Sequence, residues 1–300
     1  MNSGISPGQN TASREGVKLW RHGKSEAEEA ICRDFSGPNK VVLLIHGFTA
    51  TAEDMAGLAN FLQQEGSGCT VINCTYPCFI GIDRAAAAIA ARLDQVFPAI
   101  EENRVCVVAH SMGGLVARAL ISLNGGDRFV RGVITLGTPH LGTLKDRTGL
   151  NFLLDLMSHV KRAALTGPYF PDSRSGKQLI CADPERLIEK LRDIPATGNV
   201  SWVSFSGGMP ALEFGTNWFK NTLANWYIQK SFNSAHNDGL VGEVSSAADS
   251  SALSKCLPHA LHIGQNCKEF QEHDQINHSA LVNHGWTKVE VLKHINTFFS

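Results

Sequence analysis

Residues 104–123 read RVCVVAHSMGGLVARALISL, and this stretch decides the fold. It begins with a nearly continuous run of apolar residues, which is typical of a buried parallel strand, and it ends in a segment of helical composition. Ser111 stands between the two, with Ala109 two places before it and Gly113 two places after it. Small residues at these two places permit a sharp turn from strand to helix, which lifts the serine above the end of a sheet. The pattern therefore predicts a buried strand, a tight turn that carries Ser111, and a helix.

Strands and helices alternate on both sides of this stretch. The predicted strands are 41–45, 69–73, 104–109, 132–136, 200–205 and 260–263, and the predicted helices include 53–65, 83–97, 112–123 and 286–299. Such an alternation predicts a mostly parallel central sheet with helices on both faces.

The alternation is interrupted once, after the fourth of these strands. Residues 144–198 contain helical pieces but no good strand, so we expect an inserted helical cap there. The irregular, aromatic-containing stretch 207–236 is a candidate extension of that cap. Residues 1–16 are polar and are expected to form a flexible arm, which leaves 17–300 as one domain.

The composition is that of an ordinary globular protein and excludes some classes of partner. Hydrophobic residues make up 43% of the 300 residues, charged residues 18%, and the formal net charge is -1. So small a charge gives no field that would recruit nucleic acid, and no apolar run is long enough to span a membrane. The first residues lack the apolar core of a signal peptide, which favours a cytoplasmic location.

The chain has eight cysteines, whose spacing bears on metal binding. Cys74 and Cys78 are too few for a closed zinc site unless Cys69 or a histidine joins them. This shortage of ligands favours thiols or a disulfide over a metal, and we predict neither a metal nor a cofactor.

The segment His46-Gly47-Phe48 directly follows the predicted strand 41–45. Acyl transfer on a serine needs two N–H groups directed at the developing oxyanion. Met112, which follows Ser111, is expected to supply one, and Phe48 is the best candidate for the other. Both roles belong to the main chain. His46 is interpreted as a structural residue that orients the loop.

A serine nucleophile raised on such a turn is followed along the chain by an acid and then by a histidine. Asp238, in Asn237-Asp238-Gly239, is the candidate acid, although an Asp-Gly pair is also a common structural turn. Four histidines late in the chain are candidates for the base, and the pattern of their neighbours favours His278 over its main rival, His273; the other two are His262 and His284.

Together these motifs resemble the bacterial triacylglycerol lipases of the α/β-hydrolase fold. The resemblance covers about residues 40–285. It rests on His46-Gly47-Phe48, on Ala109-His110-Ser111-Met112-Gly113-Gly114, on Leu136-Gly137-Thr138-Pro139-His140-Leu141-Gly142-Thr143, on Val203–Gly207, on Asn237–Val241 and on Asn277–Asn283. It implies an α/β-hydrolase fold and assigns the triad to Ser111, Asp238 and His278. As the catalytic base, it therefore clearly favours His278 over His273.

The sequence departs from the lipase pattern at two positions and in the segment between Asp238 and His278, which is longer than usual. The first glycine of the serine turn is Ala109, which is small enough for the position. Lipases of this kind often bind calcium through an aspartate two residues beyond the catalytic histidine, and that place is Ala280 here. No calcium site is therefore predicted.

The motifs and the resemblance together predict a serine hydrolase of carboxylic esters, with an acyl ester or lipid as substrate and an acyl-enzyme as intermediate. The same residues could serve a thioesterase, a phospholipase or an acyltransferase. A hydrolase-fold protein that binds without turnover is a further alternative. A complete set of candidate triad residues favours an enzyme.

Overall fold

The computed structural model describes residues 16–27, 40–65, 68–96, 105–143, 173–179, 183–196, 199–208, 238, 240–247, 251–264 and 276–300. The predicted arm therefore lies almost entirely outside the described residues, as do most of the predicted cap and nearly all of its candidate extension. None of the helices in the described ranges is long and apolar enough to cross a membrane.

The centre of the protein is a seven-stranded sheet with the strand order β1-β3-β2-β4-β5-β6-β7. Its strands are β1 Lys18–Arg21, β2 Lys40–Ile45, β3 Cys69–Thr75, β4 Val105–His110, β5 Val130–Leu136, β6 Ser201–Phe205 and β7 Leu261–Ile263. Strand β1 pairs with β3 in the antiparallel direction, and all the other pairings are parallel. The predicted, mostly parallel sheet is confirmed, and β1 is an addition to the prediction.

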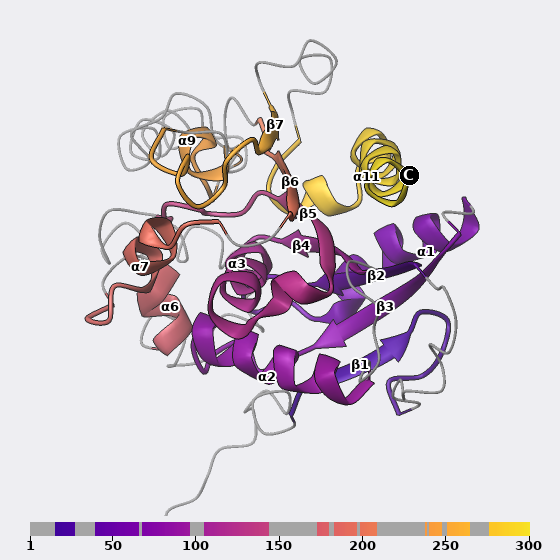
Figure 1. Cartoon of the computed structure of the whole chain (residues 1–300). Helices are drawn as coiled ribbons and strands as arrows, with labels where there is room; N and C mark the ends of the chain where they lie inside the picture. Colours follow the sequence, from indigo (N-terminus) through magenta and orange to yellow (C-terminus); the bar gives the residue numbers. More distant parts are fainter. Residues whose placement is uncertain are drawn as a thin grey trace, which may run out of the picture.

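Helices cover both faces of this sheet (Figure 1). The α-helices are α1 Ala56–Gln64, α2 Ile82–Val96, α3 Met112–Asn124, α6 Arg174–Leu179, α7 Leu187–Asp193, α9 Glu243–Ser246 and α11 Gly285–Phe299. The described residues also form the short 3-10 helices η3 Ala52–Met55, η4 Gly126–Arg128 and η5 Ala280–Val282. Helices α2 and α3 pack together on one face, and α1 and α11 pack together on the other.

Successive side chains of a strand point to opposite faces of the sheet, so one continuous apolar run contributes to two hydrophobic cores. Along β2, Val41, Leu43 and Ile45 face the core under α2 and α3, whereas Val42 and Leu44 face the core under α1 and α11. A strand buried on both faces reads as a continuous apolar run, as β2 and β4 do.

Part of the predicted cap range, helix α6, is fixed to the N-terminus of helix α2. The side chains of Ser175 and Gln178 accept hydrogen bonds from the main-chain N–H groups of Gly81 and Ile82, at 2.9 and 2.7 Å. Arg174 reaches Asp83 at 2.7 Å. Helix α6 thus caps the N-terminus of α2, whose first N–H groups have no partner inside their own helix.

Candidate active site

The turn between β4 and α3 holds Ser111 in a backbone conformation that L-residues rarely adopt. Its φ is 54° and its ψ is −126°. Two hydrogen bonds fix the turn to the next strand: Ser111 N–H donates to the Leu136 carbonyl, and Thr138 Oγ1 donates to the Ser111 carbonyl, both at 2.9 Å. The surrounding structure therefore compensates for the strain at this residue, as is common at functional sites.

Close packing explains the small residues that flank the serine. A Cβ at Gly113 would lie 2.5 Å from the Ile45 carbonyl oxygen and 2.6 Å from that of His46, and both are main-chain atoms that cannot move aside easily. Ala109 is fully buried and fits without distortion. The alanine that departs from the lipase pattern is thus compatible with the turn.

The loop after β2 packs directly against the serine. A Cβ at Gly47 would come within 2.9 Å of Ser111 Cβ. Tyr76 holds this loop in place through two contacts with His46. Its hydroxyl donates to the His46 carbonyl at 2.7 Å, and its ring stacks on the His46 ring with 4.4 Å between the ring centroids. Burial lowers the pKa of His46 to about 4, so this ring is neutral near pH 7, and its Nδ1 donates to the Gly47 carbonyl.

Met112 and Phe48 stand at the two places where the sequence predicts main-chain donors. Met112 is the first residue of α3, so its N–H has no acceptor within that helix. Phe48 is partly buried in the loop next to Gly47, and its ring meets that of Phe79 edge-on, with 5.3 Å between ring centroids. The two N–H groups thus belong to segments that meet at Ser111.

Asp238 and His278 form a buried pair, with exposed fractions of only 2% and 6%. His278 Nδ1 donates to Asp238 Oδ2 at 2.7 Å, and His278 N–H donates to the Asp238 carbonyl at 2.9 Å. The second carboxylate oxygen accepts the N–H groups of Leu240 and Val241, at 3.0 and 2.8 Å. The carboxylate is therefore fixed in orientation, and its hydrogen bond fixes the tautomer of the imidazole.

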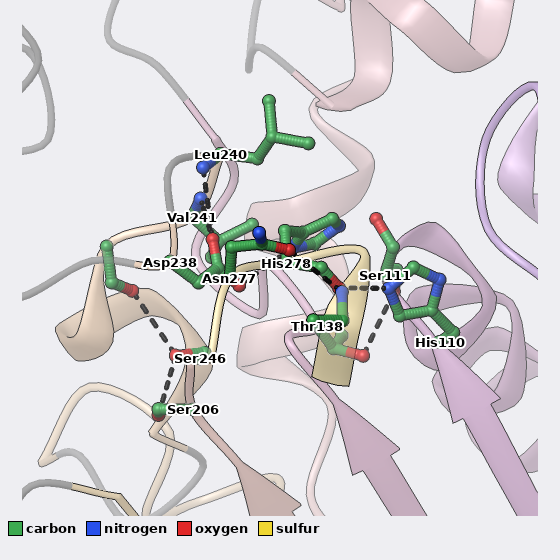
Figure 2. Close-up of polar contacts among 12 residues, drawn as sticks. His110, Ser111, Thr138, Ser206, Asp238, Leu240, Val241, Ser246, Asn277 and His278 are labelled. Carbon is green, nitrogen blue, oxygen red and sulfur yellow. Dashed lines mark hydrogen bonds and ion pairs between the residues drawn. The ribbon is translucent and has the colours of Figure 1, made fainter. Parts of the chain in front are cut away.

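The three predicted triad residues lie in one neighbourhood (Figure 2), where His278 is drawn between Asp238 and the turn that carries Ser111. The rival base, His273, lies outside the described residues. His262, another histidine late in the chain, bonds Ser206 Oγ through Nε2 at 2.7 Å instead.

His110 was not singled out as a functional residue from the sequence, yet it touches the candidate base. Its Nε2 donates to the His278 carbonyl at 3.0 Å, and the two ring centroids are 4.8 Å apart. The alternation of β4 could have placed it: Cys106 and Val108 face the core under α11, so His110 faces the same side. His278 lies shortly before α11 in the chain, on that side of the sheet.

His140 of the Gly-Thr-Pro-His segment is fully buried behind the site. Its carbonyl accepts a hydrogen bond from the buried Arg118 at 2.9 Å, and its ring contacts Thr135 Oγ1 at 3.3 Å. Burial first, and then the charge of Arg118, lower the pKa of His140 well below its usual range. These contacts are those of a structural residue that supports the segment after β5.

Within the described ranges, no group of three or more His, Cys, Asp or Glu side chains could hold a metal ion. The described ranges hold five cysteines, and none of them is in a disulfide bond: Cys69, Cys74, Cys78, Cys106 and Cys256. Cys74 and Cys78 are both buried next to the loop-supporting Tyr76. The other three cysteines lie outside the described residues.

Comparison with known proteins identifies the family. The family model described as "Putative serine esterase (DUF676)" matches residues 36–192, which is more than half of the chain. Triacylglycerol lipase 2 of Saccharomyces cerevisiae is 36% identical to the chain over 92 residues, which are 29% of this chain and 28% of the yeast protein. The chain thus matches under a third of the length of this curated relative.

Solved structures resemble the chain over most of its length. The mature form of Bacillus licheniformis lipase BlEst2 has a TM-score of 0.60 at 17% identity, over 87% of this chain and 93% of that one. Lipase 1 from Pelosinus fermentans has a TM-score of 0.56 at 14% identity, over 86% and 98% of the two chains. At such low identities the likeness shows the fold, and it confirms the α/β-hydrolase fold expected from the sequence.

The family match covers β2, β3, β4 and β5, and with them the loop of Gly47 and the turn of Ser111. The description of this family, a serine esterase, confirms the predicted class of enzyme, an ester hydrolase. This chain therefore belongs to the serine esterase family described as DUF676 and has the α/β-hydrolase fold.

Proposed function

We propose that this esterase cleaves carboxylic esters through an acyl-enzyme formed on Ser111, with His278 as general base and Asp238 as its orienting acid. The observation that carries the proposal is the buried hydrogen bond between Asp238 Oδ2 and His278 Nδ1, 2.7 Å long, beside the turn that holds Ser111. With Nδ1 protonated by this contact, Nε2 is the nitrogen left to accept a proton.

The reaction then follows from the roles of these groups. As Ser111 Oγ attacks the ester carbonyl carbon, His278 Nε2 takes the hydroxyl proton, and Asp238 stabilises the imidazolium. The N–H groups of Met112 and Phe48 bind the oxyanion of the tetrahedral intermediate. Collapse expels the alcohol, which receives the proton from His278 and leaves the acyl group on Ser111. A water molecule activated by His278 then releases the acid and restores Ser111.

We further propose that the acyl group is that of a lipid ester. The printed name of the yeast relative is a triacylglycerol lipase, and two solved relatives are called lipases. The partly buried rings of Phe48 and Phe79 lie in contact on the side of the oxyanion loop, where an apolar acyl chain would find an apolar wall.

The test measures turnover of acyl esters of increasing chain length by the purified protein and by Ser111→Ala, His278→Ala and His273→Ala. The triad variants should lose roughly 10⁴-fold or more in kcat/KM, as other triad deletions do. His273→Ala is the matched control and should stay within about tenfold of the parent, a difference of ~1.4 kcal/mol. Undiminished turnover by Ser111→Ala would refute the mechanism, whereas loss in His273→Ala alone would reassign the base.

A further inference from the structure

We propose that His110 is a positioning residue that ties the candidate base to the backbone of the candidate nucleophile. This inference rests on the triad proposed above and assigns a role to a residue outside it. The contact that carries it is the hydrogen bond from His110 Nε2 to the His278 carbonyl oxygen, 3.0 Å long. His110 is the last residue of β4 and is joined to Ser111 by a single peptide bond.

The chemistry of the two partners fixes the protonation of the His110 ring. A carbonyl oxygen can only accept, so Nε2 must carry a proton. Burial, and then the nearby His278, lower the pKa of His110 to about 3, so the ring is neutral at the pH of an ordinary assay. The other nitrogen, Nδ1, is therefore unprotonated and faces the Gly47 backbone, where an added Cβ would lie 3.4 Å away.

This bond completes the attachment of His278. Asp238 holds the residue on one side, through its carbonyl to the His278 N–H at 2.9 Å and through Oδ2 to the ring at 2.7 Å. His110 holds the opposite end of the same residue, at the carbonyl. Without the His110 bond, the remaining hydrogen bonds of His278 to other described residues would go to Asp238, and the distance between His278 Nε2 and Ser111 Oγ would be set less tightly. Small errors of position at this point lower the rate of the chemical step.

Neutrality of His110 also suits its place beside the base. His278 becomes an imidazolium during the reaction, and the centroids of the two rings are 4.8 Å apart. A second cation at this distance would oppose the charge that forms in the transition state. A neutral N–H donor holds the carbonyl without that repulsion.

The experiment compares two replacements of nearly equal size. In His110→Gln the side-chain amide can place an N–H close to the position of Nε2, whereas His110→Met fills the same space without a donor. We expect His110→Met to lower kcat roughly tenfold with KM within about twofold, because the contact acts on the reaction and not on substrate binding. His110→Gln should restore kcat to within about threefold of the parent. His294→Gln, a histidine variant on α11, controls for a general effect and should leave both constants unchanged.

A second measurement separates positioning from damage to the fold. Amide hydrogen exchange of the peptide around residues 277–283 should be faster in His110→Met and unchanged in His110→Gln, with the β2 peptide unchanged in both. Equal activity of the Met and Gln variants, or a fall in kcat with no change in exchange around His278, would overturn the proposal. If His110→Met does not fold, His110→Asn replaces it, since its amide is too short to reach the carbonyl. The outcomes for the His110 variants leave the proposed function itself intact. That function would be refuted separately, by full activity of Ser111→Ala or His278→Ala.

Discussion

Gly137 lies against His278 so closely that a Cβ at position 137 would come 3.0 Å from the imidazole Nδ1 and 2.9 Å from Asp238 Oδ2. The residue also has a φ of +59°, which favours glycine. The glycine of the Gly-Thr-Pro-His segment thus leaves the space that the acid–histidine pair fills. The sequence identifies this motif only by its resemblance to lipases, and the need for space beside Asp238 and His278 explains why its first residue is a glycine.

Gly137→Ala should therefore impair activity beyond its effect on stability. The positive φ alone should cost about 1–2 kcal/mol of unfolding free energy. The added methyl group should also push His278 from Asp238 and lower kcat more than tenfold, as measured by steady-state kinetics on an acyl ester.

Gly125→Ala provides the matched control for this prediction. Gly125 has a φ of +65° at the C-terminus of α3, but apart from its two chain neighbours no atom in the described ranges lies within 4 Å of an added Cβ. It should lose a similar free energy of unfolding and keep its kcat. Equal kcat values in the two variants would contradict the steric argument.

Tyr76→Phe should weaken the loop that carries Phe48. The variant keeps the stacked ring but leaves the buried His46 carbonyl without the hydroxyl that binds it at 2.7 Å. An unsatisfied buried acceptor costs about 1–3 kcal/mol of unfolding free energy. Because Gly47 of the same loop packs on Ser111, kcat should fall several-fold while KM changes little. A lower melting temperature with an unaltered kcat would show that this bond stabilises the fold but that the catalytic rate does not depend on it.

Asp238→Asn tests the role of the acid. An asparagine amide can fill the same space but can present a donor to Nδ1, which favours the wrong tautomer of His278. The loss in kcat should be roughly 10³- to 10⁴-fold, with near-parental stability in chemical denaturation. A loss below tenfold would mean that Asp238 does not orient the base.

The neutral, buried His46 should make the fold sensitive to acid. Its pKa is lowered by burial to about 4, whereas an unfolded chain would take up the proton near pH 6.5. The unfolded state therefore binds more protons between these values, and the free energy of unfolding should decrease as the pH falls from 6.5 to 4. The contribution of His46 to this decrease is about 3 kcal/mol.

Denaturation curves at several pH values check this expectation. His46→Asn, which can keep a donor for the Gly47 carbonyl, should flatten the pH dependence. The exposed His259, replaced by Asn, serves as the matched control for the loss of a histidine. An equal slope in the parent and in His46→Asn would contradict the assignment.

The order of strands and helices around Ser111 could be predicted from sequence because the central strands β2, β4 and β5 are buried on both faces. Such strands appear as uninterrupted apolar runs, and β2 and β4 are examples. The edge strand β1 was missed, since it is only four residues long, Lys18–Arg21, and begins and ends with a charged residue. A short strand of this kind carries little periodicity to detect.

The candidate site was predictable only where a residue is tied to a local motif. Ser111, Met112 and Phe48 follow directly from strand ends, whereas Asp238 and His278 required the order of the triad and a family resemblance. The contacts of His110, Tyr76 and Gly137 depend on segments far apart in the chain. They are set by tertiary packing, which the sequence around each residue does not describe.

The central claim, acylation of Ser111, is tested most directly by trapping the intermediate. The protein is mixed with a medium-chain p-nitrophenyl ester, quenched in acid within its first turnovers, and digested for mass spectrometry. We predict that the acyl group is found on the peptide that contains Ser111, that Asp238→Asn forms the same adduct more slowly, and that Ser111→Ala forms none while keeping the parental fold. An acyl group on another residue, or ester turnover by Ser111→Ala at the parental rate, would contradict the account.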